Sequence, residues 1–175
     1  ETFTYSFVTG AGGSDNSSFS IFGNELRTTA SFNYEVQSLY HIRIQVADAA
    51  SNTFVDTFKI AVNDINDLPT DIQLSSDSVD ENLAINALVA NLSVSDEDFG
   101  QNHAFSFNNV AGNDNALFNI VGDKLRTKAN FDYESQHQYF IYIQVDDLNG
   151  GTFTKQFTIE IKDANDVPTD ITLST

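Results

Sequence analysis

Apolar residues recur at every second position in several short stretches of this chain. In the segment 138–146, the alternating apolar residues are Tyr139, Ile141, Ile143 and Val145. This period of two is typical of a β-strand with one buried face, and no stretch has the period of a helix. The second half of the chain has seven such stretches bounded by Gly, Asn and Asp, which predicts an antiparallel β-sandwich. The expected strands lie near 71–75, 87–95, 103–107, 117–121, 124–128, 138–146 and 152–162.

Much of the sequence occurs twice. DINDLP at 64–69 returns as DANDVP at 163–168, which is 99 residues later (163 − 64 = 99), and LRTTASFNYE at 26–35 returns as LRTKANFDYE at 125–134. A fixed period of this length indicates tandem domains. The sequence therefore predicts an all-β fold of tandem seven-strand Greek-key sandwiches of the immunoglobulin-like type. We expect a repeat without its first two strands at 1–69, a complete repeat at 70–168, and the first strand of a following repeat at 169–175.

The first repeat is expected to be incomplete, because ETFTYSF at 1–7 corresponds to the third strand of the second repeat. Without two strands, this repeat would expose sheet edges, which either preceding residues or another chain would cover. The run TDITLST at 169–175 is a candidate for docking on a neighbouring chain by strand addition. The abrupt start and end of the sequence indicate a piece of a longer protein.

The composition is strongly acidic. Twenty-five Asp and Glu against eight Lys and Arg give a formal charge of −17, which argues against nucleic acid and anionic membranes as partners. A hydrophobic content of 41% still supplies material for folded cores. The charge therefore indicates either a soluble or salt-adapted surface, or acids neutralised by bound cations. There is no Cys, and no apolar run approaches the ~20 residues of a membrane span, so we expect no membrane insertion in this segment.

The acids of the second repeat fall between the expected strands. Glu81 follows the first strand, and Asp132 and Glu134 lie before the sixth. Three more polar residues follow the last strand: Asp163, Asn165 and Asp166. In an antiparallel sandwich these places can meet at one end, and a second group can meet at the other end: Asp96, Asp98, Asn102 and Asp147. Oxygen ligands gathered in this way suit calcium, which takes 6–8 of them.

The motifs DxNDxP, FDYE, DEN and DxDxGxN occur in this order around one repeat and resemble those of a cadherin domain. The TDIxLS run after each acidic connector is similar to cadherin-like repeats of large bacterial surface and secreted proteins. This resemblance covers essentially the whole chain. It implies cadherin-type sandwiches and up to three calcium ions at each junction between repeats.

The resemblance also implies ligand sets. At the internal junction, the ion nearest the second repeat would be held by Asn66, the Leu68 carbonyl, Asp96, Asp98, the Asn102 carbonyl and Asp147. The middle ion would lack one expected glutamate and be held by Glu35, Asp64, the Ile65 carbonyl, Asp67 and Asp98. The third site would lack the same glutamate and have Asn33 in place of an aspartate. The set at the C-terminal junction is Glu81, Asp132, Glu134, Asp163 and Asp166.

Other chemistries fit the residues less well. A helix-flanked calcium loop starting at Asp96 would need an acid at its twelfth position, which is Phe107. The histidines His41, His103 and His137 are scattered without ligand spacing, and each is expected to be a surface or strand residue. Carboxylate pairs can hydrolyse glycosides, but these acids recur with the family's ion-binding spacing. We therefore expect no enzyme.

Calcium bound at the seam would relieve repulsion between crowded carboxylates and join the two repeats rigidly. The expected function is a calcium-binding, extracellular or cell-surface module that mediates calcium-dependent adhesion, with a copy of itself or another surface protein as partner. Two alternatives remain open, a passive calcium-stiffened stalk and a carbohydrate-binding accessory module that recognises a glycan.

Overall fold

The computed structural model describes residues 2–168, so the expected strand at 169–175 lies outside the described residues. The chain divides into two compact units, unit 1 (Glu1–Ile65) and unit 2 (Asn66–Thr175), each of which is considered by itself. Both are built from β-strands, and each has one single-turn 3-10 helix, η1 (Asn16–Ser18) and η2 (Asn115–Leu117). None of the described residues forms a helix long and apolar enough to span a membrane.

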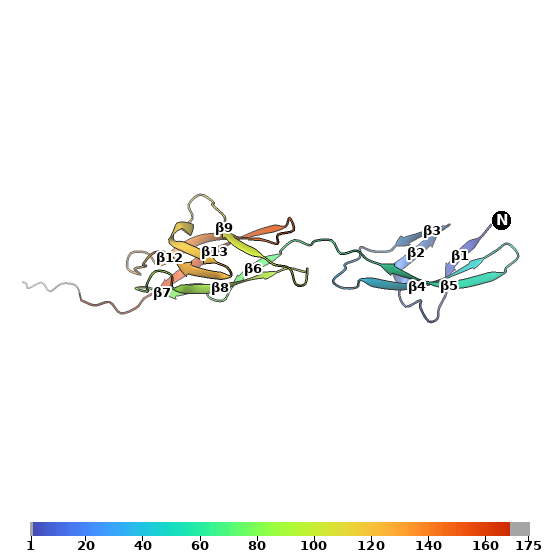
Figure 1. Cartoon of the computed structure of the whole chain (residues 1–175), viewed down its shortest axis with the longest axis horizontal. Coiled ribbons are helices and arrows are strands. Elements are labelled where there is room, and N and C mark those ends of the chain that lie inside the picture. Colours follow the sequence, from blue (N-terminus) through green and yellow to red (C-terminus); the bar gives the residue numbers. More distant parts are fainter. Residues whose placement is uncertain (1, 169–175) are drawn as a thin grey trace, which may run out of the picture. The chain divides into compact units, whose positions relative to one another are not determined.

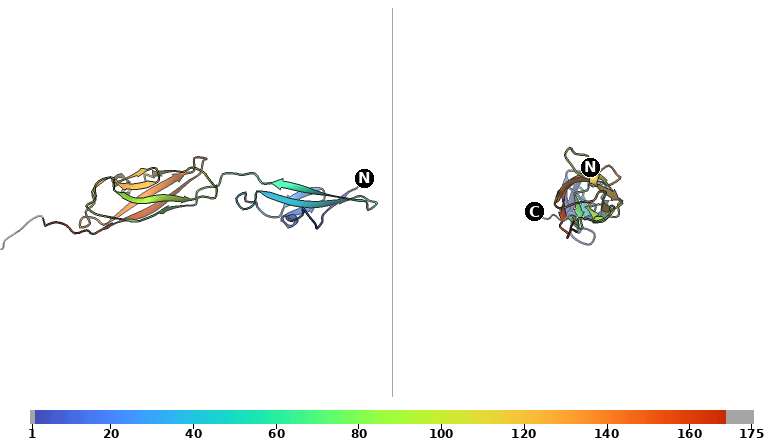
Figure 2. Two further views of the ribbon diagram at one scale, coloured as in Figure 1. Left: turned by 60° about the horizontal axis from the view of Figure 1, so that its bottom comes forward. Right: turned by 90° about the vertical axis from the view of Figure 1, so that its left-hand side faces the viewer.

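Unit 2 is a sandwich of two four-stranded sheets, which confirms the predicted all-β fold (Figures 1 and 2). One sheet has the order β10-β11-β8-β6 and the other β7-β13-β12-β9. All pairs are antiparallel except β7 with β13. The strands are β6 (Asp71–Leu74), β7 (Ser78–Asp80), β8 (Leu88–Ser95), β9 (Ala104–Phe107), β10 (Phe118–Val121), β11 (Lys124–Thr127), β12 (Gln138–Asp146) and β13 (Thr152–Lys162).

The alternation in the sequence accounts for the core of unit 2. The apolar residues of β12 that face inward are all buried: Tyr139, Ile141, Ile143 and Val145. They pack with Ile159 and Ile161 of β13 and with Phe118 and Leu125 of the opposite sheet. The sequence did not predict β7, because three residues are too few to show alternation. This strand forms where the chain leaves β6 and crosses to the other sheet, where it pairs with the last strand.

Unit 1 has counterparts of only the last five strands of unit 2. Its sheets are β1-β4-β5 and β2-β3, formed by β1 (Thr4–Phe7), β2 (Phe19–Phe22), β3 (Glu25–Thr28), β4 (Leu39–Ala47) and β5 (Thr53–Ala61). The buried core is correspondingly small. It consists of Phe19, Tyr40 and Ile42, with the ring of Phe32 stacked on Tyr40 at 4.2 Å between centroids.

Both units bind the loop before the β2–β3 or β10–β11 hairpin to the long central strand, β4 or β12, in the same way. In unit 2, Asn115 is buried, its Oδ1 accepts the backbone N–H of Tyr142 at 2.9 Å, and its Nδ2 donates to the Asn108 carbonyl at 2.8 Å. In unit 1, Asn16 makes the equivalent bonds to Arg43 and Val8. In each unit the asparagine amide thus pairs with one backbone N–H and one backbone C=O, as a neighbouring strand would do.

Replacing Asn115 by alanine is therefore expected to lower the free energy of unfolding of unit 2 by about 2 kcal/mol, because a buried N–H and a carbonyl lose their partners. Amide hydrogen exchange of β12 measures this change. Asn109→Ala, at an exposed position of the same loop, is the control and should change stability by less than about 0.5 kcal/mol. Equal effects of the two substitutions would contradict the role given to Asn115.

Candidate metal centre

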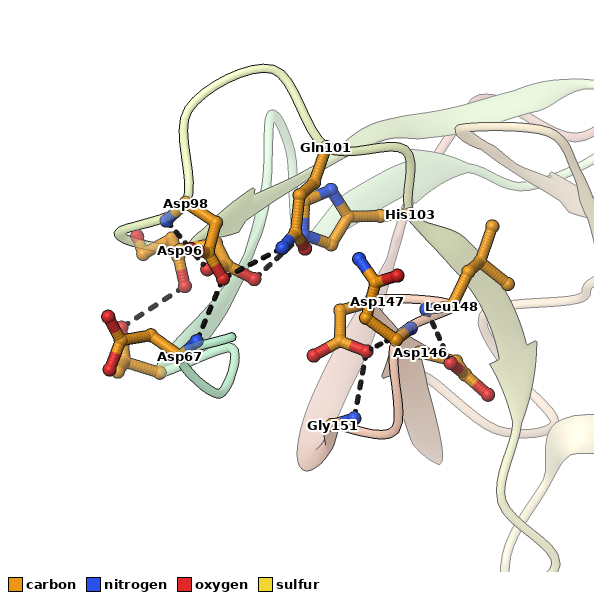
Figure 3. A network of polar contacts seen from close by, with 12 residues as sticks. Asp67, Asp96, Asp98, Gln101, His103, Asp146, Asp147, Leu148 and Gly151 are labelled. Atoms are coloured by element: carbon orange, nitrogen blue, oxygen red, sulfur yellow. Dashed lines mark hydrogen bonds and ion pairs between the residues drawn. The ribbon is translucent and has the colours of Figure 1, made fainter. Parts of the chain in front are cut away.

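Three loops of unit 2 meet at the end of the sandwich where β6 begins. The strand register places Asp71 opposite Ser95, and Asp146 opposite both Thr152 and Ala104. The connector before β6, the loop after β8 and the loop after β12 therefore leave the sheets side by side. These loops carry the acids that the sequence assigned to one ion (Figure 3).

The connector is hydrogen-bonded to both loops. The Asn66 Nδ2 donates to Asp147 Oδ2 at 2.9 Å, and the backbone N–H of Asp67 donates to Asp98 Oδ2 at 2.8 Å. Gln101 joins the two contacts, because its Nε2 lies 2.9 Å from Asn66 Oδ1 and 2.7 Å from Asp98 Oδ2. We call Asn66, Asp67, Asp96, Asp98 and Asp147 the N-terminal cluster.

Asp147 is buried and accepts several hydrogen bonds. It is 1% exposed, and its Oδ1 accepts the backbone N–H groups of Asn149 and Gly151 at 2.7 and 2.8 Å. The hydrogen bond from Asn66, followed by these backbone donors, outweighs desolvation and lowers the pKa of Asp147. A Cβ on Gly151 would lie 2.0 Å from Asp147 Oδ2, so the loop requires glycine there. Asp147 is consequently an ionised carboxylate in a fixed position.

Asp96 has a histidine partner that the sequence analysis missed. The His103 Nε2 lies 2.9 Å from Asp96 Oδ2, and the two side chains are 12% and 3% exposed. His103 was expected to be an ordinary surface or strand residue, and Gln101 was not singled out. The sequence feature that could have identified Gln101 and His103 is their closeness to Asp96, since both lie within seven residues of it in the same loop.

The remaining predicted ligands of this junction divide between the units. Leu68 lies on the connector and Asn102 on the loop before β9, both in unit 2. Glu35 lies in the turn between β3 and β4 of unit 1, and Asp64 and Ile65 follow β5. The participation of these three unit 1 residues in an ion site remains a prediction from the sequence.

At the other end of unit 2, carboxylate oxygens of Glu81, Glu134 and Asp166 lie within 4.8 Å of one another. We call these three residues the C-terminal cluster. Glu81 is 2% exposed, and its two oxygens accept the backbone N–H groups of Tyr133 and Ala164 at 2.7 and 2.8 Å. Glu81 thus ties the segments that carry the other two acids to the end of β7.

The carboxylates at this end of unit 2 repel one another, and this repulsion affects the pKa of Glu134. A hydrogen bond from its own backbone N–H favours the carboxylate of Glu134, but desolvation and the charges of Glu81, Asp166 and Asp163 outweigh it and raise its pKa. Asp132 is used in a turn, where its Oδ1 accepts the N–H of Ser135 at 3.1 Å. Of the five predicted ligands, the structure brings three into the group and leaves Asp132 and Asp163 beside it.

The donor set of the N-terminal cluster fits a hard cation. Its carboxylate and amide groups offer oxygens, which calcium prefers. Arg27, Lys124 and Lys155 form ion pairs with acids outside this cluster, namely Glu25, Asp123 and Asp71. The Gln101 Oε1 is buried beside these acids and has no hydrogen-bond partner in the described chain.

Comparison with known proteins agrees with the resemblance in the motifs. Residues 76–162 match the family model of the cadherin domain. The chain is 32% identical to Cadherin-5 of Danio rerio over 149 residues, and 31% identical to Protocadherin Fat 4 of Mus musculus over 150 residues. These alignments cover 78% and 80% of this chain but only 19% and 3% of the relatives.

Solved structures are similar across both units. The protocadherin gammaB7 EC3-6 cis-dimer structure has a TM-score of 0.66 at 26% identity and covers 95% of this chain and 41% of that one. Human protocadherin-24 EC1-2 has a TM-score of 0.71 and covers 93% and 83%, but at 18% identity it shows the fold alone.

These relationships support a non-enzymatic module of extracellular or cell-surface type, as the sequence predicted. The family match lies within unit 2. Residues 76–162 therefore match the cadherin domain family.

Proposed function

We propose that the N-terminal cluster binds one calcium ion. Its ligands would be Asn66, the Leu68 carbonyl, Asp96, Asp98, the Asn102 carbonyl and Asp147. The observation that carries this proposal is the attachment of the connector to two loops, through Asn66 to Asp147 and through Asp67 to Asp98. Ligand oxygens from three segments are thereby held together before any ion arrives, which reduces the ordering that binding requires.

We propose further that calcium couples the two units. In the ligand pattern that the family resemblance implies, Glu35, Asp64 and the Ile65 carbonyl of unit 1 share a second ion with Asp67 and Asp98. If one ion has ligands from both units, calcium binding and stiffening of the connector are thermodynamically linked. Each then favours the other. The resemblance also assigns Glu81, Asp132, Glu134, Asp163 and Asp166 to calcium at the C-terminal end, and the grouping of three of them supports this assignment.

The function that this mechanism serves best is calcium-dependent adhesion in the broad sense. Sites of this kind fill at about 10⁻⁴–10⁻³ M calcium, which is the extracellular range. A copy of this chain is the partner we favour, since one matched structure is a cis-dimer. The TDIQLS and TDITLS runs favour an origin in the repeat array of a large bacterial surface or secreted protein. A passive stalk and a glycan-binding module are the alternatives, and neither predicts calcium-dependent self-association.

Isothermal titration of the EDTA-treated chain with calcium tests the site. We expect heats that fit a Kd of about 10⁻⁴–10⁻³ M or tighter. Asp98→Asn should weaken the binding by about tenfold or more, because it removes a charge at the centre of the cluster. Asp123→Asn is the matched control, since Asp123 is exposed and paired with Lys124 away from both clusters. A silent titration, or equal effects of the two substitutions, would reject the site.

A further inference from the structure

Gln101 is uncharged, but its side chain contacts two residues of the N-terminal cluster (Figure 3). Its Nε2 donates to Asn66 Oδ1 at 2.9 Å and to Asp98 Oδ2 at 2.7 Å. A side-chain amide has two N–H groups on one nitrogen, so these two bonds use both of them. A single nitrogen thus joins the connector to the loop after β8.

The two oxygens that accept from Gln101 belong to Asn66 and Asp98, which are ligands in the proposed calcium site. The role inferred here for Gln101 therefore rests on the proposed function. Calcium binds oxygen at about 2.3–2.6 Å, and the Gln101 nitrogen lies 2.7 and 2.9 Å from these two oxygens. The positive ends of its N–H dipoles repel a dication that approaches the same oxygens. Calcium therefore competes with the Gln101 nitrogen for Asn66 and Asp98.

The oxygen of the same amide is in the opposite situation. The Gln101 Oε1 is buried and has no hydrogen-bond partner among the described residues. A buried acceptor without a donor is destabilising, whereas an amide oxygen is a good calcium ligand. Rotation about the last side-chain bond exchanges the places of Nε2 and Oε1. This rotation would bring Oε1 against the carboxylate of Asp98, which is unfavourable unless a cation lies between them.

The connector has two further attachments that do not involve Gln101. The Asn66 Nδ2 donates to Asp147 Oδ2 at 2.9 Å, and the backbone N–H of Asp67 donates to Asp98 Oδ2 at 2.8 Å. These bonds still hold the three segments of the cluster together when the Gln101 amide turns. Rotation of this amide is therefore a local change that leaves the ligand set in place.

We propose that Gln101 has two alternating roles at the N-terminal cluster. Without calcium, its nitrogen holds Asn66 and Asp98 together in the place of a cation. Calcium displaces this nitrogen, the amide turns, and Oε1 becomes a further, neutral ligand of the ion. The motif DxDxGxN does not indicate this role, because Gln101 occupies one of its unspecified positions.

The side-chain NH2 signals of Gln101 in the ¹⁵N-labelled complete chain test the displacement of the nitrogen. In EDTA we expect slow hydrogen exchange of these two protons, because both are hydrogen-bonded. Calcium at saturation should accelerate their exchange by about tenfold or more, since the ion takes their acceptors. NH2 signals and exchange that stay unchanged at saturation would overturn the proposal.

Gln101→Glu tests the oxygen, because glutamate keeps an oxygen at this place and removes the competing N–H groups. We expect calcium to bind about tenfold or more tightly than in the parent, because affinity rises with the number of charged ligands. Asn149→Asp is the control, since it adds the same charge at an exposed residue of the neighbouring loop after β12. Its effect on calcium affinity should be less than about threefold.

An amide spectrum of each variant in EDTA shows whether unit 2 is still folded, so that a change in affinity is not confused with unfolding. Equal affinities of Gln101→Glu and Asn149→Asp would show that charge alone acts, and would overturn the ligand role of Oε1. A parent chain that binds calcium with unchanged Gln101 signals would leave the proposed site intact and overturn the exchange of roles alone. A silent titration of the parent would overturn both.

Discussion

Replacing Asp147 by alanine is expected both to destabilise unit 2 and to remove calcium binding at the N-terminal cluster. The carboxylate of Asp147 accepts hydrogen bonds from Asn66, Asn149 and Gly151 at 2.7–2.9 Å. Alanine would leave the buried N–H of Gly151 without its side-chain acceptor and would release the connector. We expect the Tm of unit 2 in EDTA to fall by about 5–10 °C and the calcium titration to become silent at this site.

Asp147→Asn separates these two effects. The asparagine oxygen still accepts the backbone N–H groups, so stability should fall less than with alanine, while the loss of charge still weakens calcium binding. The neighbouring Asp146, whose Oδ1 accepts the N–H of Leu148 at 2.7 Å, provides the control Asp146→Asn. Calcium affinity equal to that of the parent in Asp147→Asn would show that Asp147 is not a ligand. An unchanged Tm in Asp147→Ala would contradict its structural role.

At the other end of unit 2, Glu81→Ala should lower the free energy of unfolding by about 3 kcal/mol in EDTA. The side chain is buried, and alanine would leave the backbone N–H groups of Tyr133 and Ala164 without their acceptor. Amide hydrogen exchange of β13 measures the change. Glu81→Ala should also abolish any calcium binding of the C-terminal cluster. Glu81 holds the segments that carry the other two acids in place, and it also contributes oxygens.

Glu134→Ala is the contrasting variant of the same cluster. Desolvation and the neighbouring acids outweigh a backbone hydrogen bond and raise the pKa of Glu134. The stabilisation from the protonated side chain is therefore complete below the unfolded pKa and is lost as the pH rises through the raised value. At neutral pH the ionised side chain therefore opposes folding, and its removal should slightly raise stability in EDTA. In calcium the same substitution should lower the Tm, since a ligand is lost. A large loss of stability in EDTA would refute this distinction between Glu81 and Glu134.

The fold followed from alternation and repetition to a large extent. The nine residues of β12 and the eleven of β13 are long enough for the period of two to define them, and the predicted ranges agree with the structure. The three residues of β7 are too few for any pattern. Their pairing with β13 depends on the crossing of the chain between sheets, which is a tertiary property and not a local preference.

The candidate site was predictable in its acids and not in their partners. The spacing of the acidic motifs singled out Asp96, Asp98 and Asp147, because carboxylates recurring at strand ends are a pattern in sequence. The contacts of Gln101 with Asn66 and of His103 with Asp96 follow from the path of one loop, which alternation does not encode.

The proposed coupling of the two units by calcium is best examined through ¹⁵N relaxation of the complete chain, which gives a rotational correlation time for each unit separately. In EDTA we expect the two units to tumble with different correlation times, as flexibly linked bodies do. With millimolar calcium both values should rise and become equal, and Asp98→Asn should prevent this change while Asp123→Asn should not. Correlation times that stay different after calorimetry has shown saturation would contradict calcium-dependent rigidity.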